Sequence, residues 1–211
     1  KYIDEELAAF PYVNGGLFSD VDIEIPSFSE ELVRLILDEA SLGFNWSEIS
    51  PTIFGAVFEA TLNPTTRRSG GMHYTSISNI HKVINPLFLD DLRQEFEEIK
   101  KRPKSDGWRT KYLKAFQEKL SHMKFLDPAC GSGNFLTETY LSLRRLENSV
   151  IRELNDEIMT GQLRLAVDTQ ALQNIKVSIM QFYGIEINDF AVTVAKTALW
   201  IAESQMLEQK N

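Results

Sequence analysis

A glycine-rich loop is the part of this sequence best suited to holding a small molecule. Phe125 and Leu126 form a short apolar run, and 127-DPACGSG-133 follows directly, before apolar sequence with helical spacing. A glycine loop between a strand and a helix lets the backbone approach a ligand and can expose amide N–H groups at the helix N-terminus. Such a loop suits a phosphate or a carboxylate group. Asp127, at the end of the strand, could face a cationic amine.

The residues around the glycines exclude two common kinds of loop. A phosphate-gripping P-loop needs a lysine directly after its last glycine, but Asn134 follows Gly133 here. A dinucleotide-binding loop needs a third glycine at position 136, which is Leu136. The remaining interpretation is a nucleoside-type cofactor without a pyrophosphate, approached closely by the backbone at Gly131 and Gly133.

An acidic residue after the second predicted strand gives an independent indication of the same kind of site. A cofactor with a ribose is held by an acid at the end of that strand, which accepts hydrogen bonds from the ribose hydroxyls. Glu186, within 183-YGIEIND-189, occupies this place. A solvent-exposed acid at a strand end is common, so it is the pairing with the glycine loop that favours the functional interpretation.

The elements that must position these residues differ between the two parts of the chain. Helix start signals and apolar spacing predict helices that begin near Ser29, at Ser50–Pro51 and at Thr75 or Ser76, and helices over about 87–101 and 108–121. The remaining sequence predicts strands over about 124–128 and 180–187. It predicts helices over about 134–148, within 149–175 and over 189–207. Strands joined through helices lie parallel. We therefore expect an α/β protein, with a mainly helical region at 1–120 and a partial doubly wound domain at 121–211.

The composition is that of a globular protein, with 43% hydrophobic and 25% charged residues. No apolar run approaches the ~20 residues of a membrane-spanning helix. One cysteine excludes an internal disulfide, which fits a cytoplasmic protein. A net charge of −8 argues against a free-standing nucleic-acid binder, although residues 61–124 hold thirteen basic against seven acidic side chains. The run 100-KKRPK-104 fits either a solvated helix surface or a strip that contacts phosphates, and the sequence leaves both open.

Several stretches together resemble a known enzyme family. DPACGSGNFL followed by YGIEIN is similar to the first two motifs of S-adenosylmethionine-dependent DNA adenine (amino) methyltransferases, most closely the MmeI-like methylases of bacterial restriction–modification systems. The stretch 70-GGMHYTS-76 resembles the element that these enzymes place before the first motif, where it helps to close the cofactor pocket. Further upstream, 11-PYVNGGLF-18 and 46-WSEISPTIFGAVFE-59 resemble the preceding helical region. The resemblance implies a Rossmann-like class I methyltransferase domain.

The resemblance also implies a role for each matching residue. The loop positions that would border the methionine part of S-adenosylmethionine are Asp127, Ala129, Gly131 and Gly133. After the second strand, Glu186 would bind the ribose and Ile187 would pack near the adenine. Tyr74 and Thr75 would approach the methionine end, where the Thr75 hydroxyl has a rival role as a helix cap.

Other reactive residue types receive no catalytic role. Cytosine-C5 methylation requires a cysteine nucleophile, and Cys130 is the one thiol of the chain. Inside the glycine loop it would face the cofactor, so we interpret it as a small loop residue. We interpret His73 as a polar surface residue. Three scattered histidines and one cysteine indicate no metal site.

The catalytic motif of the family is missing from this sequence. Amino methylation uses a [DN]-P-P-[FYW] sequence, in which a polar group accepts hydrogen bonds from the target amine and an aromatic ring stacks on the flipped base. None of the seven prolines lies in such a sequence. We therefore expect an inactive fragment of a DNA adenine-N6 methyltransferase whose full-length form binds DNA. The alternatives are a methyltransferase of a protein side-chain amine and a non-catalytic interaction module with a vestigial pocket. Unpaired sheet edges predict that the fragment self-associates.

Overall fold

The computed structural model describes residues 27–43, 45, 48–61, 75–103, 107–160 and 175–208. The chain divides into two units, Lys1–Glu48 and Ile49–Asn211. In the first unit, α2 (Glu30–Arg34) begins where the sequence predicts, because the Ser29 hydroxyl accepts a hydrogen bond from the Leu32 amide at 3.2 Å. The helix continues as the π-helical segment η1 (Leu35–Leu42). The boundary expected between residues 120 and 121 falls inside the second unit, and the division into functional domains stays a prediction.

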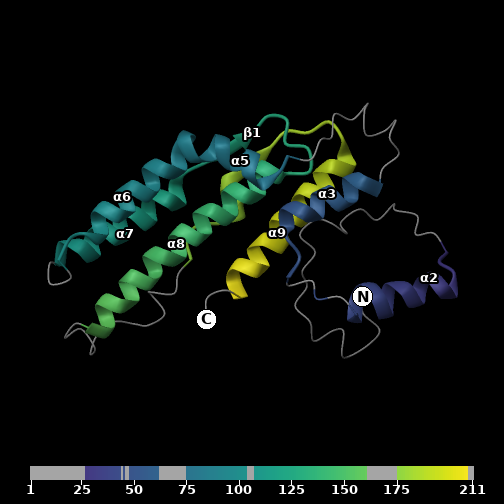
Figure 1. Cartoon of the computed structure of the whole chain (residues 1–211), viewed down its shortest axis with the longest axis horizontal. Helices are drawn as coiled ribbons and strands as arrows, with labels where there is room; N and C mark the ends of the chain where they lie inside the picture. Colours follow the sequence, from purple (N-terminus) through teal and green to yellow (C-terminus); the bar gives the residue numbers. More distant parts are fainter. Residues whose placement is uncertain are drawn as a thin grey trace. The chain divides into compact units, whose positions relative to one another are not determined.

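The other described helices belong to the second unit (Figure 1). They are α3 (Pro51–Thr61), α5 (Ile77–Ile84), η3 (Asn85–Leu89), α6 (Asp90–Lys100), α7 (Gly107–His122), α8 (Asn134–Thr160), η4 (Ile179–Gln181) and α9 (Asp189–Glu208). The cap of α5 is Ser76, whose hydroxyl accepts a hydrogen bond from the Asn79 amide at 3.4 Å. Thr75 therefore does not have the rival role as a cap. None of the described helices is both long and apolar enough to cross a membrane.

One helix is longer than the sequence pattern indicates. We expected one helix over 134–148 and a second helical stretch within 149–175. Instead a single helix, α8, runs without a break from Asn134 to Thr160. Its apolar side stays buried past the expected end, at Val150 and Leu154. Continued burial against its neighbours stabilises a helix beyond the limits that local signals set.

Two short strands form a parallel pair. Strand β1 (Phe125–Asp127) pairs with β2 (Phe182–Gly184), so that Phe125 lies beside Phe182 and Asp127 beside Gly184. Helix α8 lies between them in the chain and packs on both. The parallel arrangement and the α/β class are as predicted. On the outward face of the pair, the neighbouring side chains of Leu126 and Tyr183 are 63% and 48% exposed.

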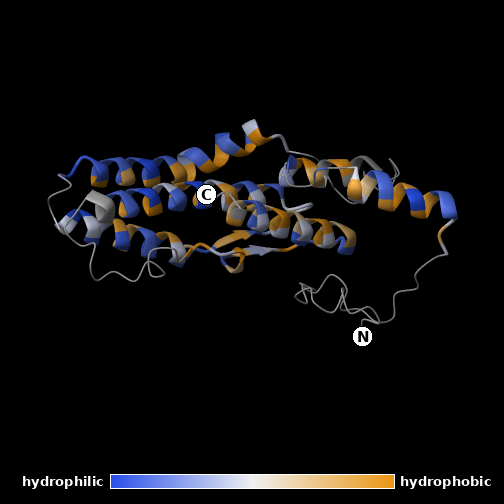
Figure 2. Cartoon of the chain, turned by 90° about the horizontal axis from the view of Figure 1, so that it is seen from below, coloured by the Kyte–Doolittle hydropathy of each residue, from blue (hydrophilic) through white to orange (hydrophobic). Residues whose placement is uncertain are grey.

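The main core lies between α6, α7, α8 and the inner face of the strands. Figure 2 shows apolar residues gathered where the helices face one another and polar residues along their outer sides. The Phe182 ring stacks on Phe125, with ring centroids 5.2 Å apart, and meets the edge of Tyr140 at 5.6 Å. Fully buried members of this core include Leu113, Leu120, Leu143 and Val150.

Buried polar side chains fix the segment that precedes β2. The Gln181 side-chain amide donates hydrogen bonds to the carbonyl oxygens of Leu120 and Met123, each at 2.8 Å, next to the start of β1. The Glu147 carboxylate on α8 is fully buried and accepts a hydrogen bond from the Val177 amide at 3.2 Å. Each such group would cost about 1–3 kcal/mol if it were left unpaired, so the pairing strongly favours one position of β2 beside β1.

Candidate cofactor-binding site

The glycine loop and the end of the second strand meet at the carboxyl edge of the strand pair. The Ile185 amide donates a hydrogen bond to the Asp127 carbonyl oxygen at 2.9 Å, and the Cys130 amide donates one to the Ile185 carbonyl oxygen at 3.0 Å. These bonds continue the pairing beyond the strands and hold the loop against the segment that carries Glu186. Parallel α/β sheets bind their ligands at this edge.

The Glu186 carboxylate is fixed by three backbone amides. Its Oε2 atom accepts a hydrogen bond from the Gly131 amide at 2.9 Å. Its Oε1 atom accepts hydrogen bonds from the amides of Ile187 at 2.8 Å and Asn188 at 3.0 Å. The Asn188 hydrogen bond is the main cause that lowers the pKa of Glu186, against the opposing effect of burial, and those from Ile187 and Gly131 lower it further. The carboxylate is therefore ionised at neutral pH. Among the described residues Oε2 accepts one hydrogen bond, so it keeps one acceptor position.

The two loop glycines have different structural reasons to be glycine. Both have positive φ, 52° at Gly131 and 78° at Gly133, a region that L side chains rarely adopt. A Cβ atom on Gly133 would lie 2.8 Å from the Cβ atom of Ala195 on α9. A Cβ atom on Gly131 would meet no atom of the described residues within 4 Å, apart from its own chain neighbours. Gly133 therefore allows the loop to pack on α9, whereas Gly131 borders open space beside Glu186.

One expectation about this loop is wrong. We expected the amides of Gly131 and Gly133 to be open to a ligand, but both are bonded within the protein. The Gly131 amide donates to Glu186, and the Gly133 amide donates to the Cys130 carbonyl oxygen at 2.8 Å because the loop turns back on itself. Asp127 can still accept a hydrogen bond from a ligand. Its Oδ1 atom accepts one from the Ala129 amide at 3.0 Å, and its second oxygen accepts none from the described residues.

Most of the predicted site residues come together. Those at the carboxyl edge of the strands are Asp127, Ala129, Gly131, Gly133, Glu186 and Ile187. Ile187 is 97% exposed, which is unusual for a large apolar side chain. Thr75 is half-buried directly before the Ser76 cap of α5, and no hydrogen bond joins it to the loop within the described part of the chain. Tyr74 and His73 lie outside the described residues.

Cys130 has the environment of a structural residue. The thiol is half-buried, and burial raises its pKa, as do the neighbouring carboxylates of Asp127 and Glu186. A protonated thiol is a poor nucleophile. This environment agrees with its interpretation as a small loop residue.

The sequence interpretation missed two glycines outside the loop. A Cβ atom on Gly55 of α3 would lie 2.9 Å from the Ser132 side chain, so α3 packs directly on the loop. A Cβ atom on Gly184 would lie 2.6 Å from the Cys130 sulfur. Gly55 carried a usable signal, because a glycine inside an apolar helical pattern often marks close packing.

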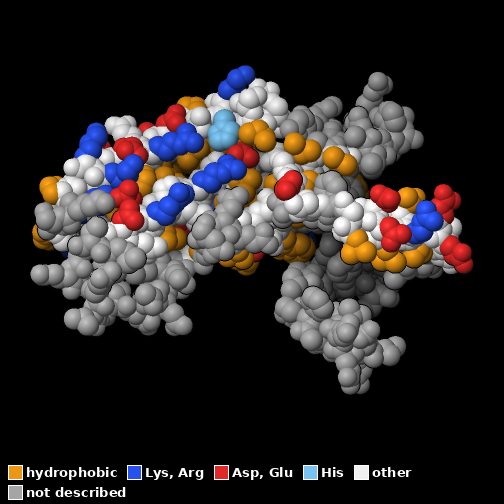
Figure 3. Space-filling model, turned by 60° about the horizontal axis from the view of Figure 1, so that its bottom comes forward, with side chains coloured by type: hydrophobic (Ala, Val, Ile, Leu, Met, Phe, Trp, Pro, Cys, Tyr) orange, Lys and Arg blue, Asp and Glu red, His pale blue; other side chains and the backbone are white. Residues whose placement is uncertain are grey.

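Two of the three described basic residues in the run 100–104 pair with acids. Lys100 pairs with Glu97 at 2.8 Å and Lys101 with Glu98 at 2.6 Å, each within one turn of helix. Figure 3 shows one face of the molecule on which Lys and Arg side chains lie among Asp and Glu side chains. This mixture favours a solvated helix surface over a strip that contacts phosphates.

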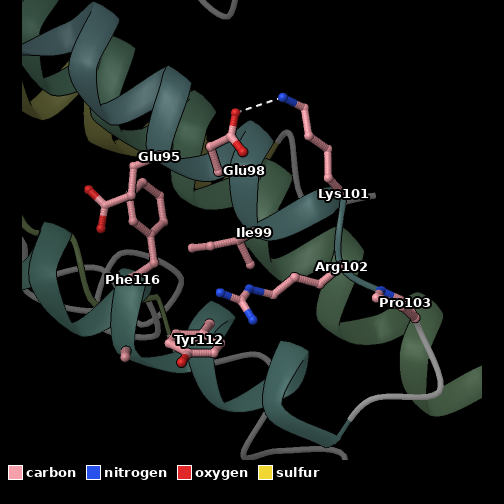
Figure 4. A pocket seen from close by; sticks show the side chains of 9 residues that line it. Glu95, Glu98, Ile99, Lys101, Arg102, Pro103, Tyr112 and Phe116 are labelled. Atoms are coloured by element: carbon pink, nitrogen blue, oxygen red, sulfur yellow. Dashed lines mark hydrogen bonds and ion pairs between the residues drawn. The ribbon is translucent and has the colours of Figure 1, made fainter.

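A cavity of about 640 Å³ lies between α6 and α7, apart from the glycine loop (Figure 4). The Arg102 guanidinium lies over the Tyr112 ring, 4.3 Å from its centroid, and Lys101 is bonded to Glu98. None of its lining residues belongs to the loop or to the segment after β2. Over the described ranges, moreover, no cluster of three or more His, Cys, Asp or Glu residues could hold a metal ion. The strand edge is therefore the candidate site.

Alanine substitutions separate the roles of the two loop glycines. Gly133→Ala is expected to lower the free energy of unfolding by roughly 2 kcal/mol or more, because the new methyl group collides with Ala195. Gly131→Ala is expected to cost about 1 kcal/mol, because only backbone strain is added. Urea denaturation of the two variants measures the difference, and equal losses would contradict the assignment.

Comparison with known proteins agrees with the motif resemblance. The family model described as the MmeI DNA-methyltransferase domain matches residues 96–211. DNA methyltransferase A of Bacillus subtilis (strain 168) is 45% identical over 203 residues, which are 96% of this chain and 21% of that protein. A putative type II restriction enzyme and methyltransferase of Methanocaldococcus jannaschii is 27% identical over 232 residues, 94% of this chain and 19% of that protein.

A solved structure extends the match to three dimensions. The Type IIL restriction-modification enzyme MmeI in complex with DNA aligns with a TM-score of 0.79 and 42% identity, over 99% of this chain and 26% of that chain. This chain thus spans only about a fifth to a quarter of the length of the relatives that it matches. Because the family model covers more than half of its residues, the chain belongs to the MmeI DNA-methyltransferase domain family.

Proposed function

We propose that the full-length protein transfers a methyl group from S-adenosylmethionine to the N6 amine of adenine in DNA, as part of a bacterial restriction–modification system. Membership of the family supports methyl transfer. The observation that carries the proposal is the junction of the Glu186 carboxylate with the Gly131 amide, next to open space at the carboxyl edge of two parallel strands. Both partners of this junction come from the motifs that resemble the cofactor-binding motifs of adenine methyltransferases.

The residues at this edge fit the groups of the cofactor. The remaining acceptor position on Glu186 suits a ribose hydroxyl, and the open space at Gly131 leaves room for the nucleoside. The second oxygen of Asp127 suits the ammonium group of the methionine part. Ile187 presents an apolar surface to the adenine. The remaining assignments, to Tyr74, Thr75, Ala129 and Gly133, rest on the resemblance alone.

The proposed chemistry places modest demands on this part of the protein. The cofactor carries its methyl group on a sulfonium, which is a good leaving group, so catalysis consists mainly of alignment and charge stabilisation. The described residues bind and orient the methyl donor. We expect the polar group that accepts hydrogen bonds from the target amine in another part of the full-length protein. We place the protein in the cytoplasm, where a bacterium keeps both its DNA and this cofactor.

The test is a methylation assay with the full-length protein, S-adenosylmethionine and unmethylated DNA. Mass spectrometry of the digested nucleosides is expected to find N6-methyladenine. Glu186→Ala is expected to weaken cofactor binding about tenfold or more, since it removes a charge-assisted hydrogen bond. Glu98→Ala, a change on the exposed side of α6, serves as the control and should have no effect.

Three results obtained with the full-length protein would contradict the proposal. Methylation of another base would refute adenine as the target, and DNA-independent methylation of a protein would support the protein-amine alternative. Failure of the full-length protein to bind S-adenosylmethionine would support a vestigial pocket. The last two outcomes correspond to the two alternatives that the sequence leaves open.

We also infer that this 211-residue chain self-associates when it is produced alone. Leu126, Tyr183 and Ile185 form an exposed apolar surface on the outer side of the strands, with Ile185 56% exposed. Leu126→Lys together with Tyr183→Lys should therefore reduce association without disturbing the core. Sedimentation equilibrium measures the mass of the unaltered and the altered chain. A clean monomer of the unaltered chain at high concentration would contradict the inference.

A further inference from the structure

A buried carboxylate ties three helices together one turn beyond the glycine loop. Glu138 of α8 is only 3% exposed. Its Oε1 atom lies 3.0 Å from His81 Nε2 of α5 and accepts a hydrogen bond from Arg145 of α8 at 3.3 Å. Its Oε2 atom accepts a long hydrogen bond of 3.5 Å from the Thr52 hydroxyl of α3. Burial of an ionised carboxylate is costly unless its oxygens are paired, so these three partners account for its presence in the interior.

The hydrogen bond between Glu138 and α3 holds the helix that packs on the glycine loop. Thr52 is fully buried and lies one turn before Gly55, the residue that packs against the Ser132 side chain. The hydrogen bond from Thr52 to Glu138 therefore holds the same side of α3 that covers the loop. A shift of α3 would remove the support of Ser132, between the two glycines of positive φ.

The tie to α5 acts on the helix that directly follows Thr75, a residue that the resemblance assigns to the cofactor site. His81 is held through both ring nitrogens, because Nδ1 lies 3.0 Å from Asn85 Oδ1 while Nε2 faces Glu138. An apolar cluster of α5 and η3 packs against Phe135, in the first turn of α8. Helix α5 begins at the Ser76 cap, directly after Thr75. The position of α5 on α8 therefore determines the position of Thr75.

We propose that Glu138 is a positioning residue for the cofactor site, which acts by holding α3 and α5 on the first turns of α8. The inference rests on the proposed function, because its effect is on binding of S-adenosylmethionine. Glu138 lies four residues after Asn134, about 6 Å along the helix from the loop. Its removal loosens the hold on α3, which packs on the loop, and on α5, which packs on α8, without removing any group that is assigned to touch the cofactor.

The same helix offers a matched control. Glu153 of α8 pairs with the buried guanidinium of Arg109 at 2.5 Å, so it too is an acid that ties a second helix to α8. It lies nineteen residues after Asn134, about 28 Å along the helix from the loop. Loss of Glu153 disturbs packing far from the site, whereas loss of Glu138 disturbs it next to the site.

The experiment compares Glu138→Leu, Glu138→Gln and Glu153→Leu in the full-length protein. Calorimetry measures the Kd for S-adenosylmethionine, steady-state kinetics measure kcat and KM, and thermal unfolding measures Tm. Glu138→Leu is expected to raise the Kd and the KM for the cofactor about tenfold, with kcat at saturation little changed. Glu138→Gln keeps an acceptor for His81 and should recover most of the affinity. Glu153→Leu should lower the Tm comparably while the Kd stays within about twofold.

Variants that remove only one hydrogen-bond partner of Glu138, here called single-tie variants, keep the test decisive if Glu138→Leu fails to fold. Thr52→Val and His81→Phe each remove one partner of the carboxylate, and each is expected to raise the Kd about threefold. A Kd within twofold of the wild type in Glu138→Leu or in both single-tie variants would overturn this inference alone. An equal rise in Glu153→Leu would also overturn it, because general destabilisation would then be the cause. A wild type that does not bind the cofactor would overturn the proposed function, and this inference with it.

Discussion

The hydrogen bond between the Gly131 amide and the Glu186 carboxylate is the contact on which the candidate site depends. It joins two residues that lie 55 positions apart in the sequence, across the ends of β1 and β2. It can form only if the strands are parallel and in register, and if the loop adopts positive φ at Gly131. The same carboxylate also accepts hydrogen bonds from the amides of Ile187 and Asn188. The acid is therefore ionised and fixed in position before any ligand arrives, which reduces the cost of ordering it on binding.

Two sets of buried polar groups hold this contact in place. In the first set, Gln181 and Glu147 fix the segment before β2 against the end of α7 and against α8. In the second set, Glu138 joins α3 and α5 to the first turns of α8. Paired polar groups of this kind favour one arrangement of helices, where an apolar core alone would tolerate small shifts. The long helix α8 carries both glutamates and thereby connects the two sets of supports.

Local features of the sequence predicted the parts of the site that depend on local physics. The glycines at 131 and 133, the strand before them and the acid at 186 follow from turn chemistry and from the strand–helix alternation. The internal bonding of the Gly131 and Gly133 amides could not be predicted, because it depends on how the loop meets the segment after β2. The Glu138 network and the contact between Gly55 and Ser132 also depend on how helices distant in the sequence pack together.

The central claim is that Glu186 and Gly131 together frame the ribose of a nucleoside cofactor. The most direct measurement is a crystal structure of the full-length protein with S-adenosylmethionine bound. We expect a ribose hydroxyl within about 3.2 Å of Glu186 Oε2, and the nucleoside in the open space beside Gly131. A cofactor bound elsewhere, with Glu186 still bonded only to backbone amides, would contradict the account.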